Sequence, residues 1–366
     1  MLELPSPIAD SLSRKGRDLT VLVVRLGAMG DILRTLAPVR LLRRAAPYCR
    51  IYWALEARWS PVLTGHADLD GLVELPRKRL DQAARSPRRW PSLPGLVLAY
   101  RRRLRAIGAD LVLDFHGTLR SGLTGRLSGA PTRVGYRGHQ QKEGNERLNT
   151  HHVASGSRRT SRMERNLDLI RALGIEVSPL PPCELPLPRA GERSARAARD
   201  SLAEPDADWA VISPGASASQ AYKKPPPELL AAACRRLRER GLVPLVVYGP
   251  GEEEDARAVV ESSGRAARLA PPTDLATLAA LIEDSRLFVG GDSGPMHLAC
   301  AVGCPVLALY GPTDPKVNQP WGVPYTALYP QDRGYTGVNR QDRLHGFEGL
   351  APERVVQSVD RMLDGR

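Results

Sequence analysis

The segment of residues 290–303, GGDSGPMHLACAVG, gathers side chains that suit a ligand site. It follows an apolar run that predicts a buried strand. Pro295 favours the first turn of a helix, which leaves Ser293 or Gly294 as the N-cap. The free N–H groups of that turn would form an anion site, reinforced by the helix dipole. We favour this reading over a capping turn beside a core histidine. The predicted site residues are Asp292, Ser293, Gly294 and His297.

Three further strand ends in the second half carry polar residues, in the segments SPGASASQAYKK, YGPGEEEDA and YGPTDP. The segment SPGASASQAYKK combines small side chains and hydroxyls with two lysines, which suit phosphate oxygens. The segment YGPGEEEDA places acids in a first helical turn, where the dipole favours them and where one could also bind ribose hydroxyls. The alternatives are a solvated loop with surface lysines and a plain helix start. The candidate residues here are Ser213, Gly215, Ser217, Lys223, Lys224, Glu252 or Glu253, and Thr313.

A similar strand end occurs near the N-terminus, in the segment RLGAMGDIL. Gly27 and Gly30 permit a tight turn before Asp31, but the spacing is not the G-x-G-x-x-G of dinucleotide sites. By spacing alone, Asp31 is best explained as the N-cap of the following helix. The functional alternative is a carboxylate that takes a proton from a hydroxyl nucleophile.

The net charge of +12 lies in one half of the 366-residue chain. Residues 1–185 hold 31 Lys and Arg against 17 Asp and Glu, whereas residues 186–366 hold 21 against 23. Such a field attracts nucleic acid, anionic lipid or a phosphorylated substrate, although an arginine-rich soluble surface is the simpler alternative. Only 5% of residues are aromatic, which leaves few platforms for stacking bases. We therefore expect no nucleic-acid partner.

The five cysteines are scattered and form no Cys-x-x-Cys pair. A disulfide framework or a zinc site is therefore not expected, and a reducing cytoplasm fits. The first twenty residues lack the apolar stretch of a signal peptide. No apolar run reaches the roughly 18 residues that a membrane helix needs. These features predict a cytoplasmic globular protein.

Apolar runs alternate with amphipathic runs along the whole chain, which predicts an α/β protein with two doubly wound parallel sheets. The prolines of SPLPPCELPLP predict a linker near residue 185. We expect a first domain at 1–185, a second domain at 186–350, and a C-terminal helix at 351–366 that packs back on the first domain. The polar residues 138–160 are predicted to form a loop.

With these residues assembled, the chain resembles the heptosyltransferases of glycosyltransferase family 9, over roughly residues 20–315. The matching segments are VLVVRLGAMGDILRTLAPVRLLRRAAP, DFHGTLRSGLTGRLSGAPTRVGY, SPGAS, YGPGEE and GGDSGPMHLACAVGCPVLALYGPTDP. The resemblance implies the GT-B fold, in which two Rossmann-like domains face each other across a cleft. Three positions depart from the family pattern: Ser293 replaces a usual Thr, His116 a common Gln and Pro226 a frequent Trp.

The resemblance also implies roles for residues. Asp31 matches the proposed general base, Lys224 the phosphate-binding lysine and Glu252 the nucleoside-binding acid. The resemblance implies that the domain at 186–350 binds the donor, a nucleotide sugar that is typically ADP-heptose. It implies that the domain at 1–185 binds the acceptor, which we expect to be an anionic glycolipid at the inner leaflet of the membrane. The expected acceptor-binding residues are Arg25, Gly30, His116, Arg120 and Arg137.

We expect an inverting transfer that needs no metal or other cofactor, because no Asp-x-Asp pair stands at these strand ends. The helix terminus and the lysine would then carry the charge of the leaving group. Three alternatives remain: a nucleotide-sugar epimerase of similar build, a basic nucleic-acid-binding protein, and a relative that has lost activity.

Overall fold

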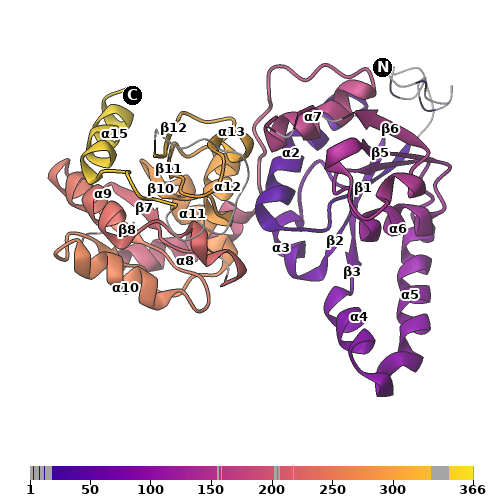
Figure 1. Cartoon of the computed structure of the whole chain (residues 1–366), viewed down its shortest axis with the longest axis horizontal. Coiled ribbons are helices and arrows are strands. Elements are labelled where there is room, and N and C mark those ends of the chain that lie inside the picture. The colour runs from indigo at the N-terminus through magenta and orange to yellow at the C-terminus, as the bar shows by residue number, and fades with distance from the viewer. Residues whose placement is uncertain are drawn as a thin grey trace. The chain divides into compact units, whose positions relative to one another are not determined.

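The computed structural model describes residues 19–154, 156–157, 159–201, 204, 207–216, 218–330 and 346–365, together with Glu3, Ile8 and Leu12. The chain divides into two compact units, Met1–Cys183 and Glu184–Arg366, which we describe separately (Figure 1).

The first unit is built on a parallel sheet with the strand order β3-β2-β1-β4-β5-β6. This is the Rossmann order, in which β1 lies at the centre. Every residue of β1 is buried, as expected for the apolar run TVLVV in a sheet covered on both faces. The strands are β1 Thr20–Val24, β2 Arg50–Glu56, β3 Gly71–Leu75, β4 Leu111–Asp114, β5 Thr132–Arg137 and β6 His151–Ala154.

Helices cover both faces of this sheet. Helix α2 packs against α7 and helix α5 packs against α6, and the two pairs lie on opposite sides of the strands (Figure 1). A 3₁₀ segment, η2, joins α4 to α5. The bounds are α2 Met29–Ala45, α3 Ser60–Leu63, α4 Arg77–Ala84, η2 Pro87–Ser92, α5 Leu93–Ala106, α6 Leu119–Ser128 and α7 Arg162–Ala172.

The second unit repeats the architecture. Its parallel sheet has the order β12-β11-β10-β7-β8-β9, which is again the Rossmann order when read from the other edge. The strands are β7 Trp209–Ser213, β8 Val243–Val246, β9 Arg268–Leu269, β10 Phe288–Gly291, β11 Val306–Leu309 and β12 Tyr325–Leu328. The helices are α8 Leu187–Asp200, α9 Pro227–Glu239, α10 Glu253–Ser262, α11 Leu275–Glu283, α12 Gly294–Val302, α13 Pro315–Asn318 and α15 Pro352–Asp364.

The α/β class with two Rossmann-like parallel sheets is confirmed, but two local predictions are wrong. Residues 138–160 are not only loop, because β6 adds an edge strand to the first sheet by pairing with β5. Helix α15 packs against α9, and its buried Val355 and Val359 belong to the core of the second unit instead of the first. Its amphipathic pattern predicts a helix but does not say which core receives the apolar face.

No helix in the described part of the chain is both long and apolar enough to cross a membrane.

Candidate functional site

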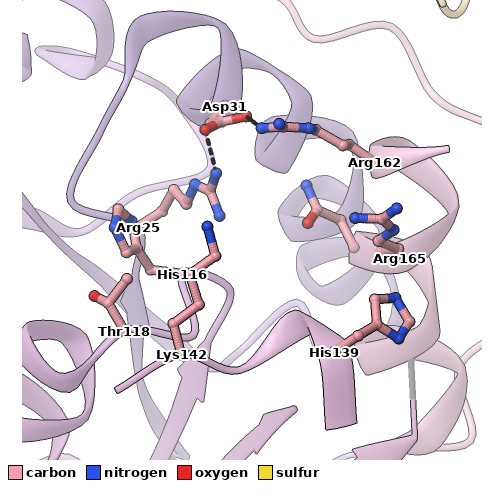
Figure 2. Close-up of a pocket in the computed structure, with 9 residues that line it drawn as sticks. Arg25, Asp31, His116, Thr118, His139, Lys142, Arg162 and Arg165 are labelled. Atoms are coloured by element: carbon pink, nitrogen blue, oxygen red, sulfur yellow. Dashed lines mark hydrogen bonds and ion pairs between the residues drawn. The ribbon is translucent and has the colours of Figure 1, made fainter. Parts of the chain in front are cut away.

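The first unit has a pocket where its strand order reverses. The carboxyl ends of β1 and β4 are neighbours there, and doubly wound sheets bind ligands at such a point. The pocket has a volume of about 210 Å³ (Figure 2). It is lined by Arg25, Asp31, His116, Thr118, His139, Lys142, Arg162, Arg165 and Asn166. Four lining side chains are Arg or Lys and one is a carboxylate, so the pocket favours an anionic ligand.

Asp31 lies among three guanidinium groups. Its carboxylate is 2.5 Å from Arg25, 2.6 Å from Arg34 and 3.3 Å from Arg162, and Figure 2 shows the first and last of these ion pairs. Burial alone would raise the pKa of Asp31, but the three arginines hold that pKa well below its usual value. The carboxylate is therefore ionised at neutral pH.

The expectation that Asp31 caps its helix is wrong. The N-cap of α2 is Ala28, and Asp31 is the third residue of the helix. Its backbone N–H donates to the Ala28 carbonyl at 3.1 Å, while its carboxylate turns to the arginines. An acid in a first turn also complements the helix dipole, which explains why the sequence fits both readings.

Neighbouring elements hold the arginines in place. The Arg25 guanidinium, just after β1, also donates to the Phe115 carbonyl at the end of β4. Helix α7 carries Arg162 to Asp31, because Asn166 donates to the Thr35 hydroxyl on α2 at 3.1 Å. The side chain of Ser161 caps α7 by accepting from the Glu164 N–H.

His116 enters the pocket from a turn that Asp114 organises. The Asp114 carboxylate accepts from the His116 and Gly117 N–H groups at 2.9 and 3.1 Å, from Ser121 Oγ at 2.9 Å and from Asn145 Nδ2 at 2.8 Å. Burial and the nearby Arg25 lower the pKa of His116 to about 3, so the imidazole is neutral. Its buried Nδ1 finds no hydrogen-bond partner among the described residues, which leaves it available to a ligand.

The predicted acceptor residues divide between this pocket and its surroundings. Arg25 and His116 line it, and Gly30 is buried in the first turn of α2. Arg120 is exposed on α6 and Arg137 ends β5, and neither is among the described residues that line the pocket. The three-residue spacing of Arg162 and Arg165, which places both on one helix face, was a signal that the sequence analysis did not use. Six lining residues in all were missed by the sequence analysis: Thr118, His139, Lys142, Arg162, Arg165 and Asn166.

The second unit has a polar cluster at its own strand reversal, between β7 and β10. Buried Asp292 follows β10 and pairs with Lys223 at 2.9 Å, while His297 Nε2 lies 3.8 Å from the same carboxylate. Ser293, one of the two predicted caps, is the N-cap of α12, yet its buried hydroxyl finds no partner among the described residues. An N-terminus with a spare hydroxyl and a nearby ammonium group suits phosphate oxygens.

Two glycines at the end of β10 lie close to neighbouring backbone: Gly291 to the lysine segment and Gly290 to strand β7. A Cβ at Gly291 would lie 2.9 Å from the Lys223 carbonyl oxygen, and a Cβ at Gly290 would lie 2.8 Å from the Ser213 carbonyl oxygen. Both neighbours are backbone atoms, which move less easily than the ends of side chains. Packing against this backbone therefore requires both glycines before Asp292.

The lysine predicted for phosphate, Lys224, pairs with Asp255 on α10, whereas its neighbour Lys223 reaches Asp292. Glu252 precedes α10, and its Oε2 accepts from the Gly249 N–H at 3.0 Å. A Cβ at Gly215 would lie only 2.0 Å from that oxygen, so the glycine admits the carboxylate to the loop after β7. Ser213 and Thr313 are buried, and Ser217 lies outside the described residues.

Among the described residues, no group of three or more His, Cys, Asp and Glu side chains is placed to hold a metal ion.

Comparison with known proteins defines the class. The family model of glycosyltransferase family 9 (heptosyltransferase) matches residues 97–347. The chain is 25% identical to lipopolysaccharide heptosyltransferase 3 of Escherichia coli, over 91% of this chain and 96% of the relative. It is 25% identical to lipopolysaccharide heptosyltransferase 1 of Pseudomonas aeruginosa, over 94% and 98%. The solved Escherichia coli heptosyltransferase WaaC with ADP shares the fold, with a TM-score of 0.72, 20% identity and coverage of 94% and 100%.

The protein is thus a glycosyltransferase of the GT-B fold class. More narrowly, the chain belongs to glycosyltransferase family 9, the heptosyltransferase family, as its motifs suggested.

Proposed function

We propose that this protein transfers a heptose from ADP-heptose to an anionic lipopolysaccharide-core acceptor. Membership of the heptosyltransferase family and the names of its relatives support this reaction. One observation carries the proposal to this chain: Lys223, Asp292 and Ser293 converge at the strand reversal of the second unit. Solved relatives contain ADP or ADP-2-deoxy-2-fluoro heptose, which is the chemistry that such a cluster suits.

In our proposal the second unit binds the donor. The N–H groups at the start of α12 and the Ser293 hydroxyl bind the diphosphate, and an ammonium group neutralises its charge. Asp292 and His297 then meet sugar hydroxyls or phosphate. Glu252 binds the ribose, and Ser213 at the end of β7, Gly215 in the loop after it and Thr313 lie along the nucleotide.

Which lysine binds phosphate is open to test. Lys223 is only 13% exposed and pairs with Asp292. Because Asp292 lies next to the N-terminus of α12, this pairing favours Lys223 as the phosphate-binding lysine. Lys224 is the residue that family resemblance suggests, and it would have to leave Asp255 to reach the same phosphate.

The first unit activates the acceptor in this proposal. Ionised Asp31 accepts the proton of an acceptor hydroxyl as that oxygen bonds to the anomeric carbon. The bond from that carbon to the diphosphate oxygen breaks, and ADP leaves on the opposite face, which inverts the configuration. No metal is invoked, because the lysine and the backbone N–H groups stabilise the leaving charge.

The arginines around Asp31 have a consequence for this step. Three guanidinium groups make the carboxylate a weak base, and base strength follows the pKa. Arg162 is the most exposed of the three, at 44% of its side chain. A phosphate or carboxylate of the acceptor that draws Arg162 away would therefore strengthen the base. The same cationic pocket would favour a phosphorylated glycolipid, which in our proposal lies at the inner face of the membrane.

The test is incubation of the purified protein with ADP-heptose and a lipid A acceptor bearing Kdo, followed by mass spectrometry of both substrates. A transferase adds one heptose to the acceptor and releases ADP in equal amount. Conversion of the donor sugar without an acceptor would instead indicate an epimerase. No change in either substrate would refute the proposed reaction.

A further inference from the structure

The first unit carries a strongly basic helical hairpin, formed by α4, η2 and α5. We call residues 77–106 the basic hairpin. It holds ten Lys and Arg residues against a single acid, Asp81. Figure 1 shows α4 and α5 running side by side away from the strands and meeting at a tip. The exposed arginines are Arg79, Arg85, Arg88, Arg89, Arg102, Arg103 and Arg105.

Large apolar side chains are exposed on the same hairpin. Trp90 at the tip is 56% exposed, and on α5 Val97 is 41% and Leu98 44% exposed. Val97 and Leu98 are consecutive residues of α5, and Trp90 lies seven residues earlier in η2, so the exposed apolar side chains extend from the tip onto the first half of α5. The indole N–H of Trp90 donates to the Ala84 carbonyl at 3.1 Å, which fixes the ring while its face stays open.

The fold itself does not need these side chains. The hairpin is anchored by Tyr100 and Leu104, which are buried in the core of the first unit. The Tyr100 hydroxyl also reaches Thr124 of α6 at 3.5 Å. Exposed Trp, Val and Leu beside arginines leave apolar area in water without a folding gain, and such patches usually meet a partner.

We propose that the basic hairpin docks on the surface of an anionic phospholipid bilayer. Trp90, Val97 and Leu98 enter the interface between head groups and acyl chains, and the arginines pair with lipid phosphates. Indole rings favour that interface, and each basic residue near an anionic leaflet adds attraction. The proposed function supplies only the setting, since the glycolipid acceptor resides in a membrane. Binding itself requires neither donor nor turnover.

Charge selects this partner over a second copy of the chain. Two copies of the hairpin would bring ten cations against ten, which repel, and the single acid cannot compensate. A nucleic acid would satisfy the arginines but would gain little from the aliphatic Val97 and Leu98, which do not stack on bases.

The experiment is co-sedimentation of the full chain with vesicles of phosphatidylglycerol and phosphatidylethanolamine, with phosphatidylcholine vesicles in parallel. The wild type should bind the anionic vesicles and release them at high salt. Two variants test the surface: Arg88→Ser/Arg89→Ser and Trp90→Ser/Val97→Ser/Leu98→Ser. Two basic residues are worth about thirtyfold in partitioning, so the first variant should lose about that factor. The second should retain loose, salt-sensitive binding only.

A matched control uses Tyr48→Ser with Arg44→Ser, an exposed aromatic and an exposed arginine outside the hairpin. It should bind vesicles as the wild type does. Unfolding temperature and ADP binding should be unchanged in every variant, which separates this test from the proposed reaction. Equal binding to both vesicle types, or undiminished binding by both hairpin variants, would overturn the inference. The inference would also be overturned if the wild type bound RNA or a second copy of itself instead of vesicles, and if the hairpin variants lost that binding.

Discussion

The Lys223 ammonium group lies 2.9 Å from the Asp292 carboxylate, and both side chains are largely buried beside the start of α12. The adjacent Lys224 is turned to Asp255 on α10. Neighbouring lysines in one loop thus have separate partners. Only one of them is held at the strand reversal where doubly wound sheets bind ligands.

This separation predicts different effects for the two lysines. Lys223→Ala should weaken ADP binding by about tenfold to a hundredfold, because a hydrogen bond to a charged group is worth about 1.5–3 kcal/mol. Lys224→Ala removes a partly exposed ion pair and should change ADP binding by less than about fivefold. Isothermal titration of both variants with ADP measures this. The reverse order of effects would return the phosphate role to Lys224.

Asp31 should stabilise the first unit as well as serve the reaction. Asp31→Asn leaves Arg25 and Arg34 buried without their counter-charge, so we expect a loss of about 3 kcal/mol in the free energy of unfolding. The folded pKa of Asp31 is depressed. Its contribution is therefore present above the ordinary aspartate value of about 4, and it is lost as the pH falls towards the folded pKa.

Urea denaturation at neutral and acid pH checks this expectation. Arg162→Ala is the control, since this more exposed partner should cost less than about 1 kcal/mol. Equal stability of Asp31→Asn and the wild type would contradict the arrangement of arginines around the carboxylate.

His116 should make the protein sensitive to acid. Its folded pKa of about 3 lies below the ordinary histidine value of about 6.5, so the folded state keeps the imidazole neutral while the unfolded state binds a proton. Stability contributed by the neutral form is complete above about pH 6.5 and falls by about 1.4 kcal/mol per pH unit below it. Between about pH 7.5 and 5 the wild type should lose about 2 kcal/mol more than His116→Gln. Parallel slopes for the two proteins would show that His116 is not held neutral.

Gly291 should tolerate no side chain. The added methyl group of Gly291→Ala would meet the backbone of Lys223 and the ring of Pro225, so we expect about 1–3 kcal/mol of destabilisation and weaker ADP binding. Gly95→Ala on α5 is a matched control, because its Cβ has open space and alanine favours helix. That control should be neutral or stabilising by up to about 1 kcal/mol in denaturant unfolding. Unaltered ADP binding by Gly291→Ala would argue that the lysine loop is not fixed against β10.

The sequence was most informative where local pattern and chemistry coincide. The apolar runs predicted both sheets, and Pro295 limited the cap of α12 to Ser293 or Gly294, of which the structure has Ser293. Partner choice was less predictable. Nothing local distinguishes Lys223 from Lys224, or shows that Asp31 turns from its own helix to Arg25 and Arg34, because long side chains choose partners that the tertiary fold supplies.

The missed elements have the same cause. Strand β6, HHVA, is a short edge strand whose apolar content is too low to stand out in a polar segment. Lys142 and Arg165 line the pocket although neither stands at the end of β1 or β4. The tertiary course of residues 138–154 and of α7 brings them there, and local sequence does not reveal that course.

Turnover and donor binding by Asp31→Ala together test the central claim most directly. With ADP-heptose and the lipid acceptor, the variant should bind ADP as the wild type does, yet form heptosylated acceptor at least about a hundredfold more slowly, the usual contribution of a general base. Near-normal product formation with intact ADP binding would contradict the assignment of Asp31 as the base that activates the acceptor.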